Sequence, residues 1–334
     1  MRLLAIADTH LGYETGKSSE ARNFTYERMF HVFEEIHQLA KKNQVDAIVH
    51  AGDLFNRSKP RKKAVKRAFD IIEEILLDDI QFLIVPGNHE RSRLPLSLLN
   101  FHQKCHFFSK LSNVTFGSCS IIGFPYQSGN ISKLFLAINK LTQKIDSKCS
   151  IILCHQLFLG ATFGPHQFMF KESHGAININ NFTSNICLFI TGHVHRAQML
   201  NGGQVVYPGA LERTSFVESI EPKGYLLIDI EDSNLKVNFH QLQSSPMSVL
   251  EINLVTHELN MDELHEKIMP GLSRTLLRLA GRSITTDELE SIKLLFPPKD
   301  YPLFVISPRF PGQIVKPLYD KCIPFEFPAF IRKF

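Results

Sequence analysis

Short apolar runs alternate with longer amphipathic segments over the first 240 residues of the chain. The short runs have the length and continuity of strands that are buried on both faces of a sheet. The longer segments repeat apolar residues every three or four positions between charges, which is typical of helices that cover a sheet. The predicted strands are Leu3–Ala7, Ala47–Ala51, Phe82–Val85, Ser120–Phe124, Ile151–Cys154, Cys187–Ile190 and Val205–Tyr207, and the predicted helices are Ala21–Lys42, Lys63–Leu77 and Ile131–Ile145.

The alternation gives way to successive strands near residue 225. Tyr225–Ile230 and Lys236–Leu242 flank a polar turn, which predicts a hairpin. Strand–helix alternation followed by successive strands predicts an α/β fold, a sandwich of mixed β-sheets flanked by helices. The Ser-Ser-Pro sequence at 244–246 interrupts both periodicities, so we place a domain boundary there and a first domain at 1–244.

A second, smaller unit follows this boundary. Its apolar pattern predicts strands and helices in alternation: Leu250–Leu254, Met261–Met269, Thr275–Leu279, Thr286–Leu295 and Leu303–Ile306. This order predicts a small α+β domain over 246–308. Residues 309–334 are interrupted by proline, and we predict a short irregular C-terminal tail.

Composition narrows the class of protein. With 334 residues, 44% hydrophobic and 21% charged, the chain can bury a substantial core and is neither disordered nor a coiled coil. No apolar run reaches the ~18 residues of a membrane span. The first apolar run stops at Asp8 without a cleavage site, which argues against a signal peptide. We therefore expect a cytoplasmic protein that does not contact membranes.

Charge is informative only in one segment. The net charge of +4 is small, but residues 57–67 contain no acidic residue. The basic residues of this run are Arg57, Lys59, Arg61, Lys62, Lys63, Lys66 and Arg67. Such a run is either a solvated helix face or a track for the phosphates of a nucleic acid, and the pattern alone leaves both open.

Polar side chains follow five of the predicted strands. They are Asp8 and His10, Asp53, Asn88 and His89, His155, and His193 with His195. In an α/β sheet the crevice beyond the carboxyl ends of the strands is the usual ligand site. Each group alone is weak, but their conjunction points to a metal centre, because carboxylates and imidazoles are ligands for divalent cations such as manganese.

This ordered set resembles the calcineurin-like metallophosphoesterase superfamily over roughly residues 1–215. Two stretches, Thr191–Gln198 and Tyr207–Phe216, are more specific and resemble the SbcD-type exonuclease family, the nuclease subunits of double-strand-break processing complexes. The openings Asp8–Gly12 and Gly52–Phe55 agree with that resemblance. The domain after Ser245 is similar in size and position to the capping domain of that family.

The resemblance implies a DNA phosphodiesterase with two divalent metal ions, manganese in the first place and magnesium as the alternative. It makes Asp53 the bridging ligand and His89 the residue that stabilises the transition state or protonates the leaving oxygen. The ligands implied for one ion are Asp8, His10 and His195, and those implied for the other are Asn88, His155 and His193. Glu90 is expected to brace the turn that carries Asn88 and His89.

Several residues and one segment bear on DNA handling. Asn56 stands where several members of the nuclease family carry a histidine, so endonuclease activity is expected more than exonuclease activity. The candidate DNA-binding residues are Asn56, Arg57, Lys59, Arg61, Lys62, Lys63, Lys66 and Arg91. The segment 158–174 is rich in phenylalanine and is either a loop that stacks on unpaired bases or a packed loop.

The resemblance also implies partners. It suggests DNA as substrate, a homodimer paired through Ala21–Lys42 and Lys63–Leu77, and an SMC-like ATPase of SbcC type. The apolar stripes of those helices are equally suited to packing on the sheet. The short tail lacks the helical ATPase-docking segment of that family, so the cap or residues 317–334 are the expected docking site. The alternatives are a phosphomonoesterase, a small-nucleotide phosphodiesterase, or a non-catalytic scaffold. Strand polarity, strand preference, the physiological metal and the partner stay open.

Overall fold

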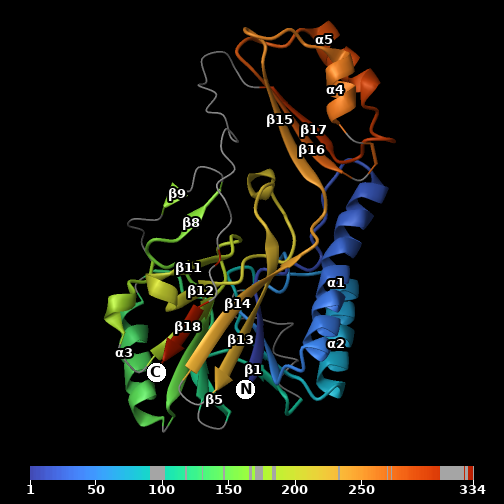
Figure 1. The fold of residues 1–334 in the computed structure, drawn as a ribbon. Coiled ribbons are helices and arrows are strands. Elements are labelled where there is room, and N and C mark those ends of the chain that lie inside the picture. The colour runs from blue at the N-terminus through green and yellow to red at the C-terminus, as the bar shows by residue number, and fades with distance from the viewer. Residues whose placement is uncertain are drawn as a thin grey trace.

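Two large mixed β-sheets pack face to face, and helices cover their outer faces in the computed structural model (Figure 1). The structure describes residues 1–90, 102–116, 119–129, 131–145, 147–164, 168–169, 176–182, 186–231, 234–268, 270–271, 273–308, 327 and 330–333. The α/β sandwich predicted from the sequence is confirmed.

The first sheet has seven strands in the order β18-β14-β13-β1-β2-β3-β4. Its members are β1 (Arg2–Ile6), β2 (Ala47–His50), β3 (Gln81–Ile84), β4 (Cys105–Phe107), β13 (Lys223–Glu231), β14 (Asn234–Leu242) and β18 (Phe330–Lys333). Strands β1 to β4 run parallel, whereas β13 is antiparallel to β1 and forms the predicted hairpin with β14.

The second sheet has six strands in the order β11-β12-β10-β7-β6-β5. They are β5 (Ser112–Phe116), β6 (Cys119–Gly123), β7 (Cys149–Cys154), β10 (Ile186–Thr191), β11 (Gln198–Leu200) and β12 (Val205–Tyr207). Loops near its edge carry β8 (Thr162–Phe163), β9 (Phe168–Met169) and the 3₁₀ turns η2 (Ile179–Asn181), η3 (Asn201–Gly203) and η4 (Phe216–Glu218). The short strands β4, β5, β8, β9 and β11 were not predicted from the sequence.

Alternation along β1 explains how the layers form. Leu3 and Ala5 face the second sheet, whereas Leu4 and Ile6 face α1 (Ser19–Lys42) and α2 (Lys62–Leu77). Successive side chains of a strand point to opposite faces, so a strand buried on both must be apolar throughout. Helix α3 (Ser132–Lys144) covers the outer face of the second sheet. The apolar stripes of α1 and α2 therefore pack within the chain.

Residues after the hairpin form a three-stranded parallel sheet with its own core. Its elements are β15 (Met247–Asn253), α4 (Met261–Lys267), β16 (Arg274–Ala280), α5 (Thr286–Leu295) and β17 (Phe304–Pro308), with strand order β15-β16-β17. Leu277, Ile292 and Phe296 belong to this separate core. The order of strands and helices agrees with the order predicted from the sequence, and we refer to this unit, residues 246–308, as the cap.

The end of the chain differs from the expected irregular tail. Phe330–Lys333 forms β18 and pairs antiparallel with β14, with Phe330 opposite Val237 and Lys333 opposite Asn234. For these residues the prediction is wrong. Without β18, strand β14 would be a sheet edge with unpaired N–H and C=O groups, and this pairing satisfies them.

A membrane-crossing helix is absent from the described part of the chain.

Arg274, at the start of β16, ties the cap to the body. Its guanidinium donates to the carbonyls of Arg213 (2.7 Å) and Thr214 (3.1 Å) and to the hydroxyl of Tyr13 (3.2 Å). The Tyr13 hydroxyl in turn donates to the Thr214 carbonyl at 2.5 Å. Arg274 is buried, so water does not replace these bonds when they are broken.

We predict that Arg274→Ala lowers the free energy of unfolding by about 2–3 kcal/mol, because it removes charge-assisted hydrogen bonds from a buried site. Arg282→Ala is the matched control, since Arg282 pairs with Glu288 at the surface of the cap. Urea unfolding of both variants gives the comparison. Equal stability of the Arg274 variant and the wild type would show that the cap is held by other contacts.

Candidate metal centre

The loops after β1 and β2 lie side by side at the carboxyl end of the first sheet. The Asp8 N–H donates to the Gly52 carbonyl and the His10 N–H to the Asp53 carbonyl, both at 3.0 Å. Asp8, His10, Asp53 and His193 all have positive φ angles, between 49° and 82°. Residues other than glycine rarely adopt this region, which is unfavourable for the backbone, so strain is concentrated where the predicted ligands meet.

The first cluster contains Asp8, His10 and His195, whose ligand atoms lie within 4.8 Å of one another. The Nε2 atoms of His10 and His195 are 3.0 Å apart, and Asp8 Oδ1 is 4.0 Å from His195 Nε2. Asp8 and His10 are almost completely buried. Two nitrogens that each bind one ion at about 2.0–2.1 Å lie about 3 Å from each other, which is close to the separation of these two Nε2 atoms.

The second cluster is arranged around the side chain of Asn88. Its Oδ1 lies 2.9 Å from His155 Nε2 and 2.9 Å from His193 Nδ1. Asp53 Oδ2 lies 3.4 Å from His155 Nε2. Asp53 also forms a close group with His10 and His89 and another with Asp8 and His155. It therefore lies between the two clusters, where a bridging ligand would be required.

Hydrogen-bond partners behind the predicted ligands fix the orientation of two imidazole rings. His155 Nδ1 lies 2.7 Å from the Ala51 carbonyl, and His195 Nδ1 lies 3.2 Å from Glu218 Oε1. An imidazole that donates its Nδ1–H in this way presents Nε2 to the centre. Lys223, fully buried, pairs with Glu218 Oε2 at 2.6 Å and donates to the His195 carbonyl at 2.9 Å. Sequence reasoning missed Glu218 and Lys223.

The electrostatics of the cluster fit a bound cation. Burial raises the pKa of Asp8, whereas at Asp53 burial is outweighed by the combined effect of His155, His10 and His89, which lowers the carboxyl pKa. Burial lowers the pKa values of His10 and His193, the latter to about 4, so both rings are neutral and offer a lone pair. Within the described residues the buried Nδ1 of His10 has no hydrogen-bond partner. Carboxylate, amide and imidazole donors suit divalent cations.

Glu90 braces the turn beneath Asp53. Its carboxylate accepts from the N–H groups of Gly87 (2.8 Å), Phe55 (2.8 Å) and Asp53 (3.1 Å). Burial and the charge of Asp53 raise the pKa of Glu90 to about 7. A Cβ atom at position 87 would lie 2.0 Å from Asp53 Oδ1, so only glycine fits. This agrees with the bracing role expected for Glu90.

His89 lies at the mouth of the centre with a third of its side chain exposed. Its N–H donates to Asp53 Oδ1 at 2.9 Å, and its Nδ1 lies 2.7 Å from the Asn56 carbonyl. Nε2 therefore points toward the centre and lies 3.7 Å from Asp53 Oδ2. Asn56 contributes its backbone carbonyl, which positions the ring, and sequence reasoning did not anticipate this contact.

His50 is another residue that sequence reasoning missed. It ends β2, and its Nδ1 accepts the Gly52 N–H at 3.2 Å. Its Nε2 must then carry the proton and donate to Thr9 Oγ1 at 2.7 Å. Burial lowers the pKa of His50 to about 3, so the ring is neutral and acts as a spacer between the two ligand-bearing loops. A polar residue inside the apolar run 47–51 was the available signal.

The structure divides the basic run into two groups. Arg61 pairs with Glu14 at 2.6 Å, Lys66 with Asp70 at 2.7 Å, and Arg67 with Glu27 and Glu34. Lys63 lies over the ring of Tyr26. Arg57, Lys59 and Lys62 are exposed and form no ion pair with any residue that the structure describes. Arg91 lies outside the described residues, as do His166 and His174 of the phenylalanine-rich segment.

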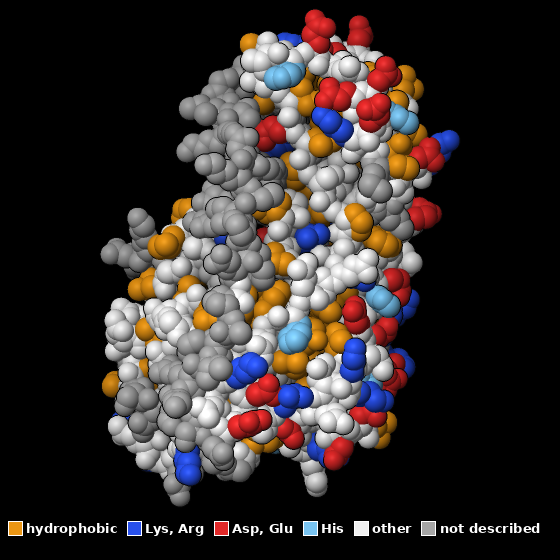
Figure 2. All heavy atoms as spheres, viewed as in Figure 1, with side chains coloured by type: hydrophobic (Ala, Val, Ile, Leu, Met, Phe, Trp, Pro, Cys, Tyr) orange, Lys and Arg blue, Asp and Glu red, His pale blue; other side chains and the backbone are white. Residues whose placement is uncertain are grey.

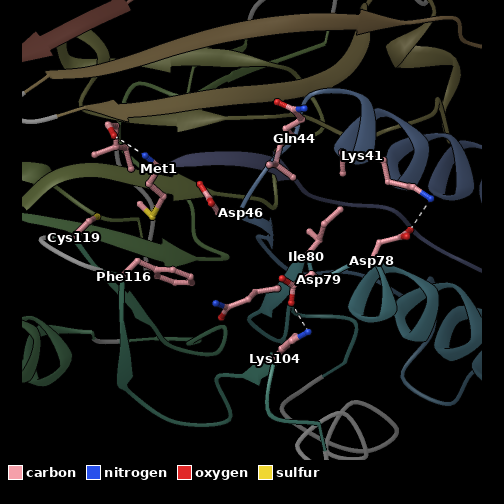
Figure 3. Close-up of a pocket in the computed structure, with 14 residues that line it drawn as sticks. Met1, Lys41, Gln44, Asp46, Asp78, Asp79, Ile80, Lys104, Phe116 and Cys119 are labelled. Atoms are coloured by element: carbon pink, nitrogen blue, oxygen red, sulfur yellow. Dashed lines mark hydrogen bonds and ion pairs between the residues drawn. The ribbon is translucent and has the colours of Figure 1, made fainter.

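A cavity of about 970 Å³ lies at the end of the first sheet that is opposite the predicted ligands (Figure 3). It is lined by Met1, Asp46 and Gln81, which begin or precede β1, β2 and β3, whereas the predicted ligands follow the other ends of these strands. Four of its charged side chains form ion pairs: Lys41 contacts Asp78 at 3.0 Å, and Lys104 contacts Asp79. This cavity is therefore separate from the metal centre.

Comparisons with known proteins agree with this geometry. The family model for calcineurin-like phosphoesterases matches residues 1–197. The chain is 26% identical over 246 residues to the DNA double-strand break repair protein Mre11 of Methanosarcina acetivorans, covering 71% of this chain and 38% of that protein. It is 24% identical over 281 residues to the Sulfolobus acidocaldarius protein of that name, covering 80% and 70%. It is 23% identical over 328 residues to the SbcD component of the SbcCD nuclease of Staphylococcus saprophyticus, covering 89% and 83%. The chain thus spans well under half of the Methanosarcina relative.

We predict that Mn²⁺ raises the melting temperature by several degrees, because an ion that binds only the folded state stabilises it. The rise should be larger at pH 8 than at pH 6, since the pKa of His155 is raised to about 9 by Asp53 and protons compete with the metal for its Nε2. Asp53→Asn should remove most of the rise, whereas Asp70→Asn on the surface of α2 should retain it. Thermal scans with and without metal give the result. A metal-induced rise in the Asp53 variant equal to that of the wild type would contradict the assignment.

Proposed function

The chain belongs to the calcineurin-like phosphoesterase family, and we propose that it is a DNA phosphodiesterase that requires two divalent metal ions. The observation that carries this proposal is the position of His89. Its Nδ1 is bound by the Asn56 carbonyl, and its Nε2 faces the two clusters of donor atoms. The names of the relatives, a DNA double-strand break repair protein and a nuclease component, favour DNA over a small phosphomonoester.

Manganese is the ion we propose, with magnesium as the alternative, because the donor set is rich in imidazole. Asp8, His10 and His195 would hold one ion, Asn88, His155 and His193 the other, and Asp53 both. When bound, two divalent cations supply Lewis-acid polarisation of the phosphodiester and lower the pKa of an attacking water. The chain itself holds the donors in place through Glu218, Glu90 and the Ala51 carbonyl.

His89 is proposed as the group that serves the leaving oxygen. As the P–O bond breaks, negative charge develops on the leaving 3′ or 5′ oxygen, and a protonated Nε2 can donate to it. The Asn56 carbonyl keeps Nδ1 protonated and restricts rotation of the ring. The partly exposed position leaves room for a strand of DNA. Endonuclease activity is proposed ahead of exonuclease activity, since Asn56 replaces the histidine of the resembling nucleases.

DNA is proposed to reach the centre along the exposed part of the basic run. Arg57 follows Asp53 by four residues, and Lys59 and Lys62 continue toward the start of α2. These cations are available for phosphates, whereas Arg61, Lys66 and Arg67 are neutralised by carboxylates. In Figure 2 acidic side chains gather over the cap helices α4 and α5. That surface repels a phosphate backbone, so we place the DNA on the body.

An SMC-like ATPase of SbcC type is the proposed partner, as the name of the Staphylococcus relative suggests. Strand β18 is part of the first sheet, so the end of the chain serves the fold, and we place the ATPase on the cap. A homodimer is also proposed. Its surface must lie outside the apolar stripes of α1 and α2, because those stripes are buried against the sheet.

The direct test is cleavage of end-labelled duplex, hairpin and single-stranded DNA with Mn²⁺ or Mg²⁺, compared with p-nitrophenyl phosphate. His89→Ala should lower kcat by about 10²- to 10⁴-fold and leave the metal content unchanged, since a general acid acts in the transition state. His257→Ala, on the cap, is the control. Loss of metal in the His89 variant would make this residue a ligand or a structural group, and cleavage of the monoester alone would contradict the proposed function.

Replacing Arg57, Lys59 and Lys62 together with Ala should weaken DNA binding for all sequences. The slope of log K against log salt should fall by about 0.7–0.9 for each phosphate that these cations no longer neutralise. The matched control replaces three exposed lysines of α3, Lys133, Lys140 and Lys144. Fluorescence anisotropy in a His89→Ala background gives the affinities without cleavage. Identical salt slopes for both triple variants would show that the basic run is a solvated helix face and does not bind DNA.

A further inference from the structure

A pocket of about 370 Å³ adjoins the metal centre on the side of the Gly-His-Val-His loop. His193 and His195 form part of its lining, so any molecule in the pocket is next to the proposed ions. Three apolar side chains also line it: the buried Val194, and Phe163 of β8 and Val217 of η4, which are partly exposed. The exposed fractions of Phe163 and Val217 are 41% and 37%, which is high for large apolar side chains beside a polar centre.

The chain fixes Phe163 in this exposed position. Thr162 is clamped by Gln198, which accepts the Thr162 N–H at 2.8 Å and donates to the Thr162 carbonyl at 2.9 Å. On the other side of Phe163, Arg196 donates to the Gly164 carbonyl at 2.9 Å. Both anchors lie just after His195 in the sequence. The backbone on both sides of Phe163 is therefore anchored to the segment after His195, and the ring packs edge-on with that of Phe168, with ring centroids 5.2 Å apart. Anchoring that exists before a ligand arrives lowers the entropic cost of binding.

The charges around the pocket are compensated internally. Arg196 pairs with Glu221 at 3.0 Å, and the buried Lys223 pairs with Glu218 at 2.6 Å. A phosphate would find no uncompensated cation among the described residues there, whereas a flat uncharged ring could contact the part of Phe163 that the Phe168 ring leaves exposed. The volume is within the range of small-ligand sites, roughly 300–1,000 Å³.

We propose that this pocket binds one unpaired nucleobase of the strand that is cut, stacked on Phe163, while the adjoining phosphodiester lies at the metal centre. This inference rests on the proposed function and extends it to the form of the substrate. Stacking on an aromatic ring accepts every base, so the pocket confers no sequence preference. A base held in a duplex cannot enter, so single strands and frayed ends are favoured.

Phe163→Ala tests the proposal, with Leu136→Ala as the matched control, since Leu136 is an exposed apolar residue on α3. The substrates are a thymidine oligomer and an oligomer of abasic residues of the same length. Phe163→Ala should raise KM for the thymidine oligomer by roughly fivefold to a hundredfold, the range expected for loss of one base–aromatic stack. The abasic oligomer should be cleaved equally by both variants and the wild type, and Phe163→Trp should restore the KM.

An unchanged KM for the thymidine oligomer, or an equal loss on both oligomers, would overturn the proposal. Thermal scans of Phe163→Ala establish that the fold is intact, as the surface position of the ring leads us to expect. A wild-type chain that cleaves neither oligomer would contradict the proposed function instead. In that case fluorescence anisotropy with the thymidine oligomer still tests whether the pocket binds a base, because binding should weaken in Phe163→Ala and not in Leu136→Ala.

Discussion

A buried carboxylate surrounded by imidazoles is the constraint on which the rest of this structure depends. Asp53 is almost completely buried, and its Oδ1 accepts the His89 N–H while its Oδ2 faces His155. Removing a charge from water is costly unless cations or donors replace the water. The close packing at Gly87 and the three N–H groups on Glu90 hold Asp53 in a left-handed conformation that it would not adopt alone.

The sandwich supplies what this constraint requires. Parallel strands β1, β2 and β3 deliver their following loops to one edge, and β7 and β10 of the second sheet deliver His155 and His193 to the same place. Because every strand of this region is buried on both faces, the loops start from a rigid base. The pocket beside His195 uses the same principle, since Gln198 and Arg196 anchor the backbone on both sides of Phe163 to the segment after His195. The proposed metal site and the pocket are therefore parts of one scaffold.

Local pattern made much of the fold predictable. Apolar continuity identified the buried strands from Leu3 to Tyr207, and polar residues at their ends identified the clusters that the structure brings together. The ion pairs of Arg67 with α1, the buried pair of Glu218 and Lys223, and the pairing of β18 with β14 were not predictable in this way. The Arg67 pairs and the β18–β14 pairing join distant segments whose proximity is set by tertiary structure, and no periodicity in the sequence encodes it. Glu218 and Lys223 are close in the sequence, but their burial behind His195 is set by the fold. The Asn56 carbonyl was missed because sequence patterns describe side chains, whereas it acts through the backbone.

The proposed chemistry requires that this edge of the sandwich hold two divalent ions that share Asp53. Anomalous diffraction from crystals grown with Mn²⁺ addresses this requirement, because the scattering identifies the metal and its position. We expect two peaks per chain, one contacted by Asp8, His10 and His195 and one by Asn88, His155 and His193, with Asp53 touching both. A single peak, or peaks that Asp53 does not contact, would refute the shared-ligand arrangement.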